Sequence, residues 1–208
     1  TLYEYIRNES IGEDFQTGSI NLEATSLAGG LLDFYAEYAS LQWDSDAPYG
    51  SEAEDGTAIY CSLTSYLGDF TVQLEYKDYD YWTYRYGRPP TADREDEVSE
   101  LDDTKGGRIK IDYFIPSTDT LVYASYALFN NQGHPDYLGR VQRNENYHYY
   151  FGIEQNWTNL YAHVTYGFQE FEEIDETHKR ATADLVYTFM DRHSLNLFGE
   201  YKYTEISA

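Results

Sequence analysis

The sequence predicts an all-β protein folded as an antiparallel, up-and-down meander of about eleven strands. Three observations predict it: polar and apolar residues alternate along most of the chain, short and long connections alternate between the segments, and no segment has the apolar spacing of an amphipathic helix. The segment 70–77 is the clearest example, since its even-numbered residues are apolar and its odd-numbered residues are polar. A period of two is typical of a strand with two different faces.

Composition narrows the class of protein. The chain has 208 residues, and it contains no apolar stretch of the roughly 20 residues that a membrane helix needs. Aromatic residues make up 18% of it, which argues against a disordered chain. With 37 acidic and 14 basic residues the net charge is −23, so we expect no nucleic-acid partner. The single cysteine, Cys61, excludes an intrachain disulfide framework.

The strands and their connections follow from the alternation and from turn residues. Strands are expected near residues 1–7, 18–28, 31–43, 57–67, 70–86, 106–115, 120–129, 146–155, 160–171, 181–189 and 194–204. Short connections are expected at 28–30, 67–69, 116–119, 156–159 and 190–193. Long connections are expected at 8–17, 44–56, 87–105, 130–145 and 172–180. Gly, Asn, Asp and Pro supply the turn conformations of the short connections.

The unbroken alternation of connection length favours a membrane barrel over a soluble sandwich. In a meander every second connection lies at the same end, and outer-membrane barrels have short turns at one end and long loops at the other. The expected strands, about ten residues or more, can cross a bilayer at a tilt. Because eleven is an odd number and both chain ends adjoin strand-like segments, we expect an open portion of a transmembrane β-barrel, with 1–208 forming a single domain of a longer chain.

The two faces of the expected strands differ in polarity, and the charged face is expected to line the lumen. Its residues are Glu23, Asp33, Glu37, Glu75, Lys77, Arg108, Lys110, Asp112, His148, Glu154, His163, Asp184, Glu200 and Lys202. Acidic residues outnumber basic ones there, so a pore would favour cations. Four acids of the early strands are expected to contribute most: Glu23, Asp33, Glu37 and Glu75. The alternative is a filled lumen in which these groups pair across strands.

Tyrosines near the strand ends are expected to form girdles at the two membrane interfaces, with the ring in the hydrocarbon boundary and the hydroxyl in water. They are Tyr66, Tyr113, Tyr147, Tyr149, Tyr187, Tyr201 and Tyr203. The alternative is that aromatic residues are simply frequent in strands.

Three short motifs carry a family resemblance. They are Leu2-Tyr3-Glu4-Tyr5 at the start, Leu74-Glu75-Tyr76-Lys77-Asp78-Tyr79 in the longest expected strand, and Arg88-Pro89-Pro90-Thr91 before an acidic segment. In these motifs the chain resembles a family of uncharacterised, porin-like outer-membrane β-barrel proteins of Gram-negative bacteria, best known from Bacteroidetes and their relatives. The resemblance implies a fold and a location in the outer membrane. It implies no particular activity.

The long connections are strongly acidic, with carboxylates clustered in 44–56, 87–105 and 172–180. Such clusters can bind Ca²⁺ or Mg²⁺, or bridge through these ions to lipopolysaccharide phosphates. No segment has the Asp-x-Asp-x-Asn-Gly spacing of a calcium-binding loop. We therefore expect solvated loops and no cofactor, with loop-bound Ca or Mg as the alternative.

Catalysis is not expected. His148 and His163 fall on the same side as two carboxylates, Glu154 and Asp184, which is the pattern of a base with an orienting acid. The chain has no Gly-x-Ser-x-Gly nucleophile motif, however, and two histidines are unremarkable on a polar strand face.

The sequence therefore favours a passive, porin-like channel in the bacterial outer membrane. Its expected partners are outer-membrane lipid, lipopolysaccharide and small hydrated solutes. One alternative is a barrel that does not conduct and whose acidic, tyrosine-rich loops bind a partner protein, glycan or metal. A second is a soluble extracellular β-sheet protein that binds glycans on aromatic platforms, for which the candidates are Trp43, Trp82 and Trp157.

Overall fold

The described part of the chain is all-β, and it contains eleven strands, as the alternation predicts. The computed structural model describes residues 2–8, 13–43, 55–80, 104–131, 145–171, 176–189 and 193–206. The strands are β1 (Leu2–Asn8), β2 (Glu13–Ser26), β3 (Leu32–Trp43), β4 (Gly56–Leu67), β5 (Phe70–Asp80), β6 (Thr104–Ile115), β7 (Thr120–Asn131), β8 (Glu145–Asn156), β9 (Leu160–Phe171), β10 (Glu176–Phe189) and β11 (His193–Ile206).

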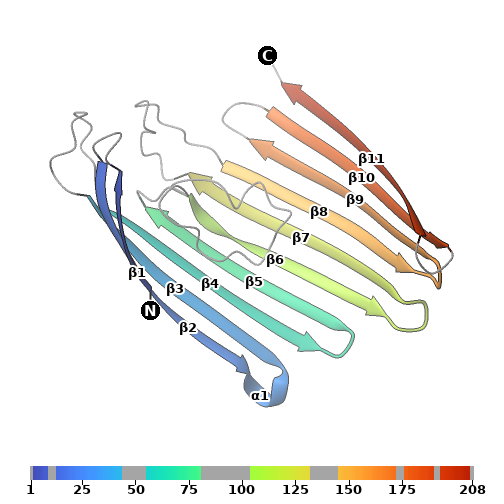
Figure 1. Ribbon diagram of the computed structural model, residues 1–208, viewed down its shortest axis with the longest axis horizontal. Helices are drawn as coiled ribbons and strands as arrows, with labels where there is room; N and C mark the ends of the chain where they lie inside the picture. The colour runs from blue at the N-terminus through green and yellow to red at the C-terminus, as the bar shows by residue number, and fades with distance from the viewer. Residues whose placement is uncertain are drawn as a thin grey trace. The chain divides into compact units, whose positions relative to one another are not determined.

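The strands form one sheet in chain order, from β1 to β11, so that each strand neighbours the strands before and after it (Figure 1). The pairs β1–β2, β2–β3, β8–β9, β9–β10 and β10–β11 are antiparallel, with a continuous register. The predicted meander, with next-neighbour pairing and no crossover among the described strands, is confirmed. The sheet is open, and β1 and β11 are its edges.

Two strands begin five residues earlier than the sequence pattern predicts. β2 starts at Glu13 instead of residue 18, and β10 starts at Glu176 instead of residue 181. The segment Glu176–Arg180 is polar throughout, so it shows no alternation, yet its backbone pairs with β9 on one side and with β11 on the other. A strand held on both sides does not need an alternating pattern to persist. The expected strand 70–86 is described as far as Asp80.

The short connections contain left-handed backbone conformations, in part at the glycines that the sequence places there. Between β2 and β3 lies one short helical turn, α1 (Leu27–Gly30), where Ala28 and Gly29 have φ of 52° and 77°. Asp33 supports this connection, since its carboxylate accepts a hydrogen bond of 2.7 Å from the backbone N–H of Ser26. None of the helical structure among the described residues is long and apolar enough to cross a membrane.

The chain divides into two compact units, each described by itself below. The first unit contains Thr1–Leu63, Glu75–Gly107 and Phe129–Asn144. The second unit contains Thr64–Leu74, Arg108–Leu128 and Glu145–Ala208.

Along β5, exposed apolar residues alternate with buried charged ones. In β5, Leu74 is 45% exposed, whereas the next residue, Glu75, is only 6% exposed. Tyr76 is again exposed and Lys77 is again buried. The apolar residues of this strand therefore face outward and the charged ones inward, which is the opposite of a strand on the surface of a water-soluble core.

The turn between β4 and β5 gives a test of the backbone geometry. Gly68 has φ +66°, and a Cβ there would meet nothing within 4 Å. Gly68→Ala should therefore lower the free energy of unfolding by about 1 kcal/mol through backbone strain alone. The measurement is equilibrium unfolding in urea. Gly199→Ala is the control, because a Cβ there also meets open space and φ lies outside the left-handed region. An equal effect in the two variants would contradict this account.

Candidate functional site

The polar side chains of the second unit form rows across β8 to β11. The register places Glu154 opposite His163, and His163 opposite Asp184. Further along the strands, Thr165 lies opposite Thr182, which lies opposite Glu200. Since side chains in directly paired positions lie on the same face, these rows define one surface, here called the polar face of the second unit.

The other face of the same strands is apolar. Its rows, read across β8, β9, β10 and β11, are Ile153–Val164–Ala183–Gly199, Phe151–Tyr166–Ala181–Tyr201 and Tyr149–Phe168–Lys179–Tyr203. Most of the large residues in these rows are exposed, including Phe151, Ile153 and Val164. The second unit therefore has an apolar surface that the described structure leaves uncovered.

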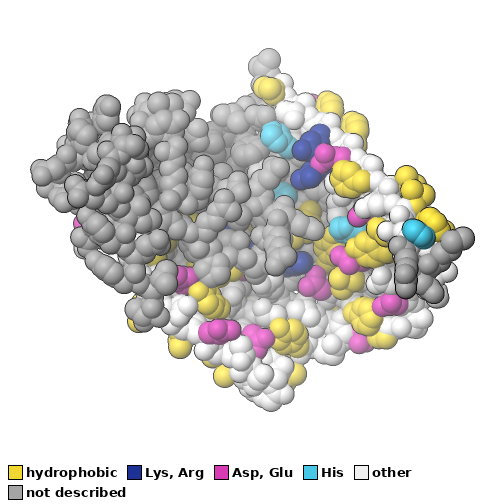
Figure 2. Space-filling view, viewed as in Figure 1, with side chains coloured by type: hydrophobic (Ala, Val, Ile, Leu, Met, Phe, Trp, Pro, Cys, Tyr) yellow, Lys and Arg dark blue, Asp and Glu magenta, His cyan; other side chains and the backbone are white. Residues whose placement is uncertain are grey.

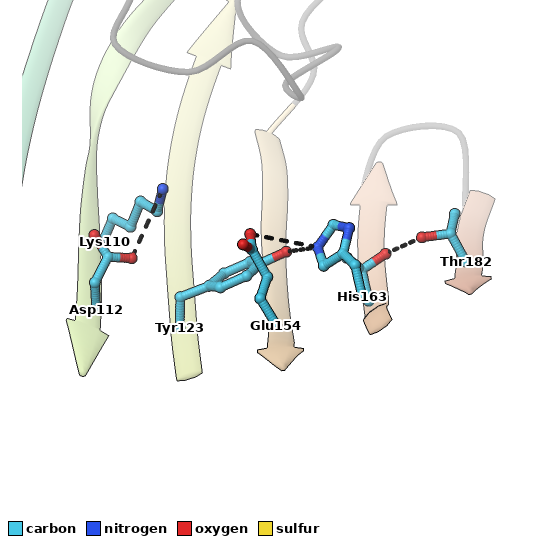
Figure 3. A network of polar contacts seen from close by, with 7 residues as sticks. Lys110, Asp112, Tyr123, Glu154, His163 and Thr182 are labelled. Carbon is cyan, nitrogen blue, oxygen red and sulfur yellow. Dashed lines mark hydrogen bonds and ion pairs between the residues drawn. The ribbon is translucent and has the colours of Figure 1, made fainter. Parts of the chain in front are cut away.

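A hydrogen-bonded network crosses the polar face (Figure 3). The hydroxyl of Tyr123, on β7, lies 2.5 Å from Nε2 of His163, on β9. An oxygen of Glu154, on β8, lies 3.9 Å from the same nitrogen. Figure 3 shows both side chains pointing at the imidazole. When protonated, His163 is thus placed to make an ion pair with Glu154 while it stays in contact with the phenol.

The network continues onto β6. The ammonium of Lys110 lies over the ring of Tyr123, 5.5 Å from its centroid, and 3.7 Å from a carboxylate oxygen of Asp112. A cation over an aromatic face is attracted by the ring quadrupole. Side chains from four consecutive strands are therefore linked, which ties the polar face together across the sheet.

Tyr123 reaches His163 by passing over a glycine. A Cβ added at Gly152, on the intervening strand β8, would collide with Cζ and the hydroxyl of the Tyr123 ring. Tyr123 itself is 5% exposed, and its ring meets that of Tyr150 edge-on at 5.9 Å. The absence of a side chain at Gly152 is thus what lets the ring lie flat across β8.

The first unit has a more tightly packed set of polar contacts. The hydroxyl of Tyr60, on β4, donates a hydrogen bond to Glu75, on β5. The ammonium of Lys77 lies 5.5 Å from the ring centroid of Phe129 and 5.9 Å from that of Tyr79. All five of these side chains are buried. Their charges are held by protein groups and have little contact with water.

The expected lumen residues thus fall into three groups by exposure. Glu75, Lys77 and Arg108 are buried. Those in partly exposed positions are Asp33, Glu37, Lys110, Asp112, His148, Glu154, His163 and Asp184, and those in exposed positions are Glu23, Glu200 and Lys202. Three residues of these contacts carry no signal in the sequence pattern: Tyr123, Gly152 and Arg180. Arg180 falls in an expected long connection, 172–180, and the role of an uncharged ring or of a glycine depends on the register between strands.

The tyrosines expected in the girdles differ in exposure, and their place at a membrane interface stays a prediction. Six of the seven tyrosines are exposed to varying degrees: Tyr66, Tyr113, Tyr149, Tyr187, Tyr201 and Tyr203. Three of them stack on a neighbouring ring: Tyr113 on Phe70 at 4.3 Å, Tyr149 on Phe168 at 4.6 Å and Tyr187 on Phe189 at 6.2 Å. Tyr147 is partly exposed.

Two further hypotheses from the sequence concern catalysis and metal binding. Across β8–β10 the structure brings Glu154, His163 and Asp184 into register, but the group that meets the imidazole is a phenol of a buried, cross-strand ring. Within the described ranges, no group of three or more His, Cys, Asp or Glu side chains is arranged to hold a metal ion. Most of the acidic segments 44–56 and 87–105, and residues 172–175, lie outside the described residues.

No known family model matches the chain, and no curated protein matches it. The family resemblance described above therefore stays a prediction.

The crossing of Tyr123 over Gly152 predicts a sharp steric effect. Gly152→Ala should lower the free energy of unfolding by about 1–3 kcal/mol, because the new methyl group would collide with a buried ring. The measurement is urea unfolding followed by tyrosine fluorescence. Gly167→Ala is the matched control on the next strand, where the nearest atom to a Cβ is 3.7 Å away.

A second substitution separates this clash from a general effect of alanine. Tyr123→Ala removes the ring, so Gly152→Ala should cost much less in the double variant than alone. Additive effects of the two substitutions would contradict the proposed contact.

Proposed function

We propose that the chain forms part of the wall of an outer-membrane β-barrel, with its apolar face toward lipid and its polar face toward a water-filled lumen. The observation that carries this proposal is the inverted exposure of the strands, as in β5, where Leu74 is exposed and Glu75 is buried. A water-soluble sheet of this polarity would leave its apolar side in contact with water.

The energetic argument concerns the apolar face. Burying one large apolar side chain contributes about 1.5–3 kcal/mol, and the exposed ones here include Leu22, Phe151 and Leu197. An exposed apolar surface of this extent is typical of contact with a membrane or a partner. Strands of 11–14 residues from β2 to β11 are long enough to span a bilayer at the usual tilt.

Passage of hydrated solutes is the function that the polar face of the second unit supports best. Its charged groups remain in contact with water, as Glu154 shows with a side chain that is 32% exposed. Polar groups that line a pore replace part of a solute's hydration and so lower the barrier to its passage. Across the expected lumen residues, acidic groups are the majority, which favours cations.

A second candidate is a barrel that does not conduct. The burial of Glu75, Lys77 and Arg108 favours it, because charged groups packed against protein leave no room for solutes beside them. In that barrel the charged side chains act as struts between strands, and the acidic outer loops bind a partner.

The lipid-facing assignment predicts the effect of a charge at Leu74. Leu74→Arg should lower the free energy of folding into phosphatidylcholine vesicles by roughly 2–4 kcal/mol, if the residue lies near the bilayer midplane. The measurement is a urea titration in the presence of vesicles. Gln73→Arg is the matched control, because the neighbouring residue faces the opposite side. A neutral Leu74→Arg variant would count against membrane insertion of this face.

The channel assignment predicts a change in ion selectivity. Neutralising the four early acids, as Glu23→Gln, Asp33→Asn, Glu37→Gln and Glu75→Gln, should bring the reversal potential in a salt gradient closer to that of an unselective pore. The effect should be largest at low ionic strength, since charges are screened over about 10 Å at 0.1 M salt. Glu75 should contribute least of the four, because it is buried and bonded to Tyr60.

The recordings use the whole protein in planar bilayers. Asp78→Asn is the control, because Asp78 lies on the outward-facing series of β5, where it accepts hydrogen bonds from Tyr76 and Lys105. Absence of any conductance in the unmodified protein would favour the barrel that does not conduct. Conductance with an unchanged reversal potential would mean that other residues line the pore.

A further inference from the structure

Two basic side chains lie directly opposite each other on the polar face of the second unit. The register of β10 and β11 pairs Arg180 with Lys202. Both side chains are well exposed, at 47% and 61%. In Figure 2, basic side chains gather beside a histidine and acidic side chains near the upper part of β10 and β11.

Like charges in directly paired positions disfavour the strand pairing that brings them together. One carboxylate lies between the two cations. Oε1 of Glu200 lies 2.7 Å from Nε of Arg180 and 3.6 Å from Nζ of Lys202. Two positive charges thus share one carboxylate oxygen, and the three groups together carry a net charge of +1.

Groups that can form hydrogen bonds lie around the pair. On β9, Gly167 lies opposite Arg180, and a Cβ there would meet Cβ of Tyr150 at 3.7 Å and Nε2 of His148 at 3.8 Å, so an imidazole lies beside this row. In the next row, His178 lies opposite Gln169 on one side and Thr204 on the other. Imidazole, amide and hydroxyl groups next to two cations are all able to donate hydrogen bonds to an oxyanion.

The position of this pair is unexpected for a chain of net charge −23. Lys179 and Arg180 each lie close to a carboxylate, at 3.8 Å from Glu205 and 2.7 Å from Glu200. They lie on opposite faces of β10, and Arg180 differs in that its paired position on β11 holds a second cation, Lys202. The polar face therefore carries two cations in directly paired positions.

We propose that Arg180 and Lys202, with His178 beside them, form a binding site for an oxyanion, that is, for the phosphate or carboxylate group of a small dissolved solute. The guanidinium supplies planar donors that match such a group, and the ammonium supplies a mobile charge. The bound oxyanion takes over part of the interaction with Glu200 and relieves the repulsion across the strand pair. This site requires only that the polar face is in contact with water. It does not require that the protein conducts ions.

The test is isothermal titration of the purified chain in detergent micelles with inorganic phosphate, and separately with succinate, at constant ionic strength set by chloride. Arg180→Gln and Lys202→Gln should each weaken binding by about tenfold, the value of one charge-assisted hydrogen bond. Glu200→Gln should strengthen binding, because it removes the competing carboxylate. Lys179→Gln is the matched control, since it removes a cation from the same strand on the opposite face.

The outcomes decide the proposal without reference to channel activity. Weaker binding in the two polar-face variants, stronger binding in Glu200→Gln and unchanged binding in Lys179→Gln would establish the site. The ratio of the phosphate and succinate affinities would assign the preferred oxyanion. Lack of binding to either anion by the unmodified chain, or an equal loss in Lys179→Gln, would overturn it. Arg180 and Lys202 are both exposed, so their variants should fold normally, and circular dichroism checks this.

Discussion

Antiparallel pairing between sequence neighbours is the constraint on which the rest of this structure depends. In the second unit it places His163 between Glu154 and Asp184, and one residue further along it places Val164 between Ile153 and Ala183 on the other face. A slip of one residue in any strand would move its charges to the apolar face. The polarity pattern of each strand therefore fixes its register against the neighbouring strands. The contacts of the polar face form only in that register.

The inverted polarity of the strands has a consequence for how the polar face is stabilised. Polar side chains such as Ser125 and Gln169 are buried on that side together with the rings of Tyr123 and Tyr150. Buried polar groups need hydrogen-bond partners. In the second unit, cross-strand contacts join Tyr123 with His163, Thr165 with Thr182 and Arg180 with Glu200. These bonds join adjacent or next-adjacent strands, so polar contacts add to the packing of the buried rings on this face.

Strand number, meander topology and the faces of the strands could be predicted from sequence, because a period of two is a local signal. The start of β10 could not, because Glu176–Arg180 is polar throughout and is held by its neighbours alone. That error hid Arg180, and with it the pairing to Lys202. The contact of Tyr123 with Gly152 was out of reach for a different reason: it depends on the register between strands and on the length of a ring, neither of which alternation reveals.

Net charge is a poor guide to what a solute would meet on this protein. Buried charges such as Glu75 and Lys77 interact mainly with their protein neighbours, whereas the hydrated charges of the second unit act on anything in the water beside them. Screening confines that action to about 10 Å at 0.1 M salt, which is about two or three strand spacings. Two neighbouring cations can therefore attract an anion locally, even though the chain as a whole is acidic. The chemistry of the polar face is set row by row, by the order in which the strands bring their residues together.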